Sequence, residues 1–524
     1  MKKSQLILAI AGVLSLIVGL FTSLYYLDLL GLLFLLSIVV LRSEKYDLLK
    51  MSLGMVLICF LLTWIIPKAD FSTGKYAVGE ITRMGIFDLF TDGLATTIYY
   101  FFMMATFIFV LGAFYQFLSK LDAYQKLTSS IAEKIKGKEI IFSVIISFII
   151  AVLSSITNEQ YVIIAFIPFI ITILDKAGMN KMSTFVTTFG AILVGILGSI
   201  VSTKIVGMNV QYFQLDYNYR LKTKIAFFLV IFVIYTLFNV LYLRKNTVKV
   251  AKVKSTKTKK SQKETKEEVV VTDSIDLFEN KDVDSKNANI IPLVIVGILL
   301  LIVSILAYLP WTTVFNVSWF TDAYNWFIEF KLFGAPIFSY IFGSQLQEFG
   351  NWTLITMQIV MIITMLILQL CYRVNINNFV ESISEGVKKV SKLVMLVILS
   401  YSILVLTVVF PVIPTIANKI LTTKFNVFNS LVSGMFAGLF NADYQYTVNL
   451  LYYNFYELYP NNLKVVSVIL QSTYGLMSFI TPASAILFVG LRYLNISYKE
   501  YMKYIWKFLL AAFVLVIALA FFVM

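Results

Sequence analysis

Three ionisable side chains interrupt apolar parts of this sequence. Glu159 lies between two charge-free runs, 140–153 and 161–174, Lys204 is alone in another apolar run, and Asp443 lies in a polar break. An ionisable group at bilayer depth is costly, usually faces a cavity, and often marks a path for an ion or a substrate. These three residues are therefore the first candidates for ligand binding.

Glu159 admits three interpretations. It is an exposed loop acid if both flanking runs are complete spans. It is a structural acid if it pairs with a cation or caps a helix. It is a ligand if it holds a coupling cation or the cationic end of a substrate. The same alternatives apply to Asp443, whose flanks are richer in tyrosine and asparagine.

Lys204 and several neutral polar residues complete the candidate binding site. A buried Lys204 would be the counter-charge for a substrate carboxylate, whereas a peripheral one would extend to the membrane interface. Amides and hydroxyls can bind carboxylates or Na⁺, but they also cap helices or bond back to helix carbonyls. The neutral candidates are Asn158, Ser202, Thr203, Asn209, Asn441, Thr481 and Ser484.

The composition places these residues in a polytopic membrane protein. The 524 residues are 59% hydrophobic and 14% charged, against roughly 25% charged in soluble domains. The sequence has no histidine, the usual zinc ligand and general base, so we predict no metal site, no catalytic residues and no cofactor beyond a coupling Na⁺ or H⁺. Cys59 and Cys371 form no disulfide framework.

A charged segment divides the chain into two membrane halves, 1–243 and 289–524. Residues 244–288 are basic and then acidic without apolar periodicity, which predicts a disordered linker. Lysine-rich loops face the cytoplasm, so the net charge of +14 reflects topology, not nucleic-acid binding. The N-terminus and linker are predicted to be cytoplasmic in a multi-pass plasma-membrane protein, with lipid contacts. Predicted spans are 5–22, 28–42, 51–67, 95–118, 225–243, 290–308, 353–372, 394–411 and 505–523.

The two halves share one pattern. Each has two short helical pieces around a tip with an asparagine and a carboxylate, followed by a helix broken at Ser/Thr with Gly or Pro. Paired broken helices in inverted repeats are typical of secondary transporters. The predicted fold is all-α, with two inverted repeats whose hairpins are re-entrant. The first hairpin and broken helix are about 140–175 and 182–211, and the second about 429–459 and 463–491. An amphipathic helix, 379–393, is predicted near the cytoplasmic face.

Several segments resemble a known family. The chain is similar to YfcC-type members of the anaerobic C4-dicarboxylate carrier (DcuC-like) family, within the ion transporter superfamily. In the first half the resemblance rests on TWIIPKADFSTGKY (63–76), GIFDLFTDG (85–93) and the segment 107–139, which ends in KGKE. In the second half it rests on NNFVESISEGVKKV (377–390) and FITPASAILFVGLRYLNISYKEY (479–501).

The resemblance implies two inverted repeats, a homodimer, and uptake or exchange of small carboxylate-bearing metabolites. The sequence departs from the family at the predicted binding positions. The first tip, SSITNEQY, has less glycine and acid than in relatives, and Gly207, Met208, Asn209 stand where relatives carry Asn-Pro-Phe. The second tip, GLFNADYQY, lacks a Pro-Ser pattern.

The sequence thus predicts a secondary active transporter of a small carboxylate-bearing metabolite, working by alternating access with ion coupling or exchange. Two tip acids and one lysine favour an amino acid, since a negative lining repels a dicarboxylate. The alternatives are a C4-dicarboxylate carrier of the same fold or a membrane-embedded lipid-modifying enzyme. The absence of histidine counts against the enzyme, so we predict no enzymatic activity.

Overall fold

The computed structural model describes residues 3–22, 27, 30–31, 34–35, 47–258, 275–279, 285, 287–343 and 346–524. Most of the predicted span 28–42 and much of the predicted linker lie outside these residues. Eight helices of the described chain are long and apolar enough to cross a membrane: Leu48–Ile65, Ile86–Ser119, Glu139–Ile156, Leu221–Arg244, Ile291–Tyr308, Leu354–Tyr372, Ile376–Val409 and Tyr498–Phe522. The chain is therefore an all-α, multi-pass membrane protein.

The N-terminal half contains short helical pieces between long helices. Its α-helices are α1 (Lys3–Thr22), α3 (Asp47–Ile65), α4 (Ile86–Asp88), α5 (Thr96–Ser119), α6 (Asp122–Ile135), α7 (Glu139–Ile156), α8 (Tyr161–Ile164), α9 (Ile167–Lys176), α10 (Lys181–Phe185), α11 (Ala191–Leu197), α12 (Met208–Phe213) and α13 (Leu221–Thr258). Three segments are π-helical: η1 (Leu89–Ala95), η2 (Val186–Gly190) and η3 (Thr203–Gly207). Strands β1 (Ala69–Asp70) and β2 (Ala77–Val78) pair antiparallel.

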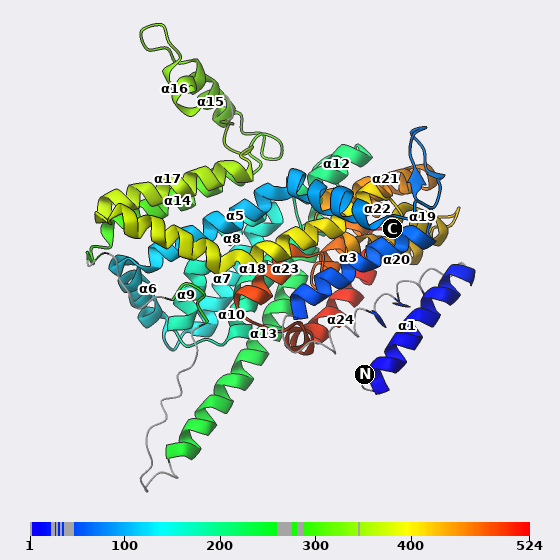
Figure 1. The fold of residues 1–524 in the computed structure, drawn as a ribbon, viewed down its shortest axis with the longest axis horizontal. Helices are drawn as coiled ribbons and strands as arrows, with labels where there is room; N and C mark the ends of the chain where they lie inside the picture. Colours follow the sequence, from blue (N-terminus) through cyan, green and yellow to red (C-terminus); the bar gives the residue numbers. More distant parts are fainter. Residues whose placement is uncertain are drawn as a thin grey trace.

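The C-terminal half also contains short helices between long ones. Its helices are α14 (Ile291–Tyr308), α15 (Trp319–Glu329), α16 (Ile337–Phe342), α17 (Leu354–Tyr372), α18 (Ile376–Val409), α19 (Ile413–Ile420), α20 (Val427–Phe440), α21 (Tyr444–Leu458), the 3₁₀ turn η4 (Pro460–Asn462), α22 (Leu463–Met477), α23 (Ala485–Tyr493) and α24 (Tyr498–Phe522). Helices α14 and α17 run side by side, and α15 and α16 project from the body (Figure 1).

Helix α18 corrects one expectation. The predicted interfacial helix 379–393 and the predicted span 394–411 form one continuous helix, Ile376–Val409. It packs along α5, where a Cβ added to Gly112 would lie 2.7 Å from the carbonyl oxygen of Gly386. Glycine at this crossing lets the two backbones approach closely, as is common between membrane helices. The polar face of α18 is occupied in part by Glu385, which pairs with Lys120 at 3.0 Å.

The first predicted hairpin contains a longer helix than expected. Helix α7 has 18 residues rather than the 14 of 140–153, and it is long enough to span a membrane. The second arm divides into α8 and α9 at Ala165 and Phe166, with Pro168 in the first turn of α9, a position where proline is well tolerated. Helices α20 and α21 form the second pair. The re-entrant character of both pairs stays a prediction.

The predicted linker contains ordered pieces. Helix α13 continues to Thr258, well beyond the expected boundary at residue 243. Residues 275–279 lie against other parts of the chain, and the Phe278 side chain is 2% exposed. Residue 285 forms a bridge with Leu121. In the described residues, therefore, the segment 244–288 is not uniformly disordered.

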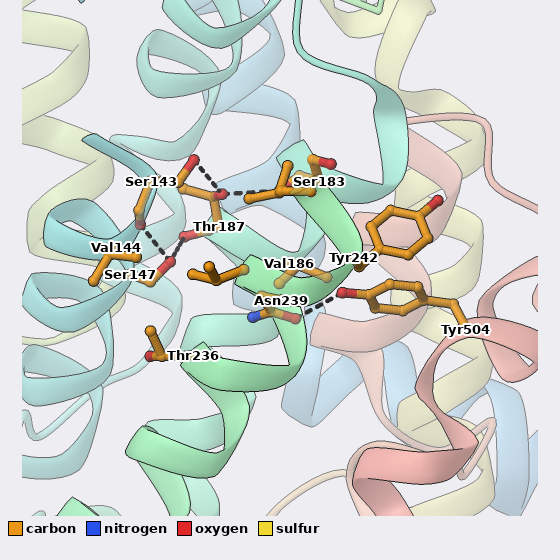
Figure 2. Close-up of a pocket in the computed structure, with 12 residues that line it drawn as sticks. Ser143, Val144, Ser147, Ser183, Val186, Thr187, Thr236, Asn239, Tyr242 and Tyr504 are labelled. Carbon is orange, nitrogen blue, oxygen red and sulfur yellow. Dashed lines mark hydrogen bonds between the residues drawn. The ribbon is translucent and has the colours of Figure 1, made fainter. Parts of the chain in front are cut away.

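Hydroxyl groups join α7 to η2 in the apolar interior. The Thr187 hydroxyl donates to the Ser143 hydroxyl at 3.1 Å, and the Ser147 hydroxyl donates to the Ser143 carbonyl at 2.7 Å (Figure 2). On the other side of this small pocket, the Tyr504 hydroxyl of α24 donates to Asn239 of α13 at 2.7 Å (Figure 2). These bonds join the helices at the pocket, although not every buried hydroxyl that lines it has a hydrogen-bond partner among the described residues.

Candidate substrate and ion site

The two hairpin tips meet at a single lysine. The Lys204 ammonium lies 2.9 Å from a carboxylate oxygen of Asp443 and 3.5 Å from one of Glu159. Glu159 and Asp443 are each 9% exposed. This burial excludes the interpretation of Glu159 as an exposed loop acid. Residues 159, 204 and 443 are far apart in the chain, and only the fold brings them together.

The break in the first helix directs Lys204 to the tips. Helix α11 ends at Leu197, and the next residues leave the helical path before η3 begins at Thr203. The backbone N–H groups of Ile200, Val201 and Ser202 all point to the carbonyl oxygen of Ser155, at 2.9, 3.3 and 3.3 Å. The C-terminal end of α7 therefore supplies the acceptor that the broken helix lacks, as unwound backbone inside a membrane protein requires.

The first tip is tied to the C-terminal half. The backbone N–H of Asn158 donates to the carbonyl of Tyr308 at 2.9 Å, and its side-chain amide donates to the carbonyl of Gly350. The Thr203 hydroxyl donates to the side-chain oxygen, Oδ1, of Asn158 at 2.7 Å. Glu159 accepts from the backbone N–H of Tyr161 at 3.2 Å. Asn158 thus fixes the position from which Glu159 reaches Lys204.

The side chains of the second tip bond to their own helices and to Lys204. Asp443 is the N-cap of α21 and accepts from the backbone N–H of Gln445 at 3.1 Å, while its other oxygen binds Lys204. The Asn441 amide donates to the Ala437 carbonyl at 3.0 Å, within α20. In the described part of the chain, the buried Oδ1 atom of Asn441 has no hydrogen-bond partner. Asp443 therefore combines the capping and charge-pairing roles that the sequence left open.

A small cavity adjoins the three charges. Its volume is about 30 Å³, and a water molecule needs roughly 10–15 Å³ measured in the same way. The cavity therefore has room for one or two waters and not for a metabolite. Besides the charges, its lining consists largely of tyrosines and isoleucines: Tyr161, Tyr401, Tyr444, Tyr474, Ile196, Ile205 and Ile486.

Sequence reasoning missed these tyrosines. Tyr161 and Tyr444 directly follow the two tips and could have been found by their position. Tyr401 lies in the middle of a span, and Tyr474 in a long helix, where an aromatic residue carries no signal by itself. The Tyr474 hydroxyl donates to the Ala442 carbonyl at 3.1 Å and so supports the second tip.

Four of the remaining predicted residues do not line the cavity. The Ser202 hydroxyl donates to the Thr157 carbonyl at 2.6 Å. Asn209 donates to the Tyr219 hydroxyl at 2.9 Å and accepts from Tyr444 at 2.7 Å, which links α12 to α21. The Thr481 hydroxyl donates to the Leu439 carbonyl, and Ser484 precedes α23. Ser202, Asn209 and Thr481 therefore bond to residues at or beside the tips, and a direct binding role for all four residues stays a prediction.

The arrangement suits ionic recognition. No group of three or more cysteine and acidic side chains able to hold a metal ion occurs in the described residues. A cationic nitrogen between two carboxylates can exchange partners with a ligand carboxylate, and each freed carboxylate can accept a cation or a proton.

The comparisons with known proteins point to one family. No curated protein matches the chain. A solved structure described as that of MtrF from Neisseria gonorrhoeae, which illuminates a class of antimetabolite efflux pumps, matches at 10% identity and a TM-score of 0.38 over 93% of this chain and 96% of that one. Likeness at this level supports no functional inference. Residues 47–524 match the family DcuC, C4-dicarboxylate anaerobic carrier, so the chain belongs to that family of membrane transporters.

Proposed function

We propose that this protein is a secondary active carrier for C4-dicarboxylates that binds them where the two hairpin tips meet. One observation carries the proposal: Lys204 of the first broken helix lies between Glu159 and Asp443, one carboxylate from each half of the chain. Family membership supports the substrate class and favours a carrier over a membrane enzyme.

The charge of the site implies coupling to cations. One lysine against two carboxylates leaves a formal charge of −1, and a dicarboxylate would bring two further negative charges. Like charges at a buried site repel strongly, because the surroundings screen them weakly. A dicarboxylate therefore binds only after Na⁺ or H⁺ neutralises Glu159 and Asp443. Lys204 is then released to pair with a substrate carboxylate.

Alternating access would follow from the same geometry. The cavity is too small for a metabolite, so the helices must move before a substrate can reach the three charges. Two inverted repeats with re-entrant hairpins would let the tips separate from Lys204 on opposite faces of the membrane. The proposal includes a homodimer in the plasma membrane with its N-terminus and linker in the cytoplasm.

The excess of carboxylates favours a second candidate. A zwitterionic or cationic amino acid could place its ammonium between Glu159 and Asp443 and its carboxylate on Lys204, without a coupling cation. The family supports the dicarboxylate, and the site charge supports the amino acid.

Uptake by proteoliposomes separates the two candidates. Labelled succinate and labelled arginine are offered with no gradient, with an inward Na⁺ gradient and with an inward proton gradient. We expect succinate uptake that requires one of the cation gradients and is lost in Lys204→Met. Arginine uptake without a gradient, lost in Glu159→Gln, would establish the amino-acid carrier. Uptake of neither compound under any gradient would overturn both.

A further inference from the structure

A short piece of the linker packs against helices of both halves of the chain. Residues 275–279, which we call the linker clip, lie against α5, α9 and α23. The Phe278 side chain is 2% exposed. Its ring packs against the rings of Tyr115 and Tyr493, with centroid-to-centroid distances of 6.0 and 5.9 Å. These two tyrosines belong to different halves of the chain, so the clip bridges them.

Polar contacts between the clip and α9 are reciprocal. The Thr172 hydroxyl of α9 donates to the Asp276 carboxylate at 2.7 Å. In return, the Asp175 carboxylate of α9 accepts from the backbone N–H groups of Ile275 and Asp276, both at 3.3 Å. Each side therefore supplies a carboxylate that the other satisfies, which makes this a specific docking contact.

Burial removes water from the Asp276 carboxylate, and hydrogen bonds replace part of that lost hydration. Burial raises the pKa of Asp276, while the hydrogen bonds from Thr172 and from the Phe278 N–H lower it. A buried acid is tolerated when hydrogen bonds replace its lost hydration. Two side chains of the clip therefore make its main contacts: the Asp276 carboxylate and, two positions later, the Phe278 ring.

The clip contacts the outer ends of the elements that build the central site. Helix α9 belongs to the second arm of the first hairpin, and α23 is the second part of the second broken helix. Helix α9 is also fixed to α6, because Lys176 donates to the Gln125 side chain at 2.8 Å and to the Thr128 hydroxyl at 2.6 Å. A separation of the tips from Lys204 that moves α9 or α23 must therefore break the clip contacts.

We propose that the linker clip is an intramolecular ligand that stabilises the closed conformation of the carrier by joining α5, α9 and α23. Only its consequence for transport rests on the proposed function. Because the clip docks on the closed arrangement, its loss shifts the population toward conformations with an open site. The linker then sets how often the tips separate.

The test measures access to the second tip in purified full-length protein. Ala442, which lines the cavity, is replaced by cysteine in a background with Cys59→Ala and Cys371→Ala, and its labelling by a soluble maleimide is timed. Phe278→Ala removes the buried ring, and we expect labelling to become about tenfold faster, the change that loss of a buried aromatic contact commonly produces. Glu279→Gln is the matched control, since Glu279 is exposed in the same segment.

A peptide of residues 272–281 keeps the test independent of folding. Added to the Phe278→Ala protein, it should return labelling toward the parent rate, and the same peptide with Phe278→Ala should not. Unchanged or slower labelling in both Phe278→Ala and Asp276→Ala would overturn the clip. Succinate with the coupling cation should also change the parent labelling rate. Failure of that result alone would count against the proposed function and not against the clip.

Discussion

The two hairpin tips carry equivalent acids but are held in different ways. Asn158 of the first tip bonds to the carbonyl of Gly350 and to Thr203, outside its own helix pair. Asn441 of the second tip bonds to Ala437 of its own helix. The Asn158 side chain therefore anchors the first tip to other segments, whereas the Asn441 side chain bonds within its own helix. The second tip takes its outside support from Tyr474 and Thr481 instead.

The two broken helices differ in the residue that each supplies to the site. The first supplies Lys204, the cation of the site, while the second supplies Thr481, which bonds back to the end of α20. The N-terminal half thus contributes one acid and the cation of the site, and the C-terminal half contributes the second acid.

The largest effect is expected where the two tips share a partner. Lys204→Met should reduce succinate uptake by at least about 100-fold, because it leaves two buried carboxylates without a counter-charge. Initial uptake rates in proteoliposomes measure it. Lys222→Met, an exposed lysine at the start of α13, is the control and should transport normally. A Lys204→Met protein with parent rates would remove this lysine from the mechanism.

Neutralising one tip acid at a time compares the tips directly. Asp443→Asn should lower uptake by roughly tenfold and Glu159→Gln by less, because Asp443 lies closer to Lys204, at 2.9 against 3.5 Å. Asparagine remains a good N-cap, so Asp443→Asn changes the charge and keeps the cap of α21. Uptake is measured against the concentration of coupling cation. A larger loss in Glu159→Gln would reverse the proposed order of the tips.

Substitution of the two tip asparagines should affect the stability of the folded protein by different amounts. Asn158→Ala should destabilise the folded protein by roughly 1–3 kcal/mol, because it strands buried partners on two other segments. Asn441→Ala should cost less, since it removes one bond together with an unsatisfied buried oxygen. Thermal unfolding of the two variants in the same detergent gives the order. Equal melting temperatures would show that the first tip is not specially anchored.

Ser484→Ala should have the smallest effect. Ser484 precedes α23 without a side-chain capping bond and does not line the cavity, so uptake should change less than about twofold. The matched variant is Thr481→Val, which removes the bond to Leu439 and should affect uptake more. A strong loss in Ser484→Ala would move the substrate toward the second broken helix.

Much of the architecture follows from the sequence because the bilayer imposes simple demands. Runs of about 20 apolar residues must be helices, and a lone Glu159 or Lys204 inside them must find a polar partner. The same rules divided α18 into an amphipathic helix and a span, whereas it is one continuous helix. Its face with Gly386 and Val390 packs on α5, a contact that no local pattern reveals, while Lys388 stays exposed.

The sequence by itself determined that this is a polytopic helical membrane protein with ionisable residues at paired helix breaks, since hydropathy and charge are local properties. Only the tertiary structure decided that Glu159, Lys204 and Asp443 form one cluster, that four tyrosines surround it, and that Phe278 of the linker occupies a groove. These contacts join residues more than a hundred positions apart in most cases. Their partners are chosen by helix packing, which single-residue patterns do not encode.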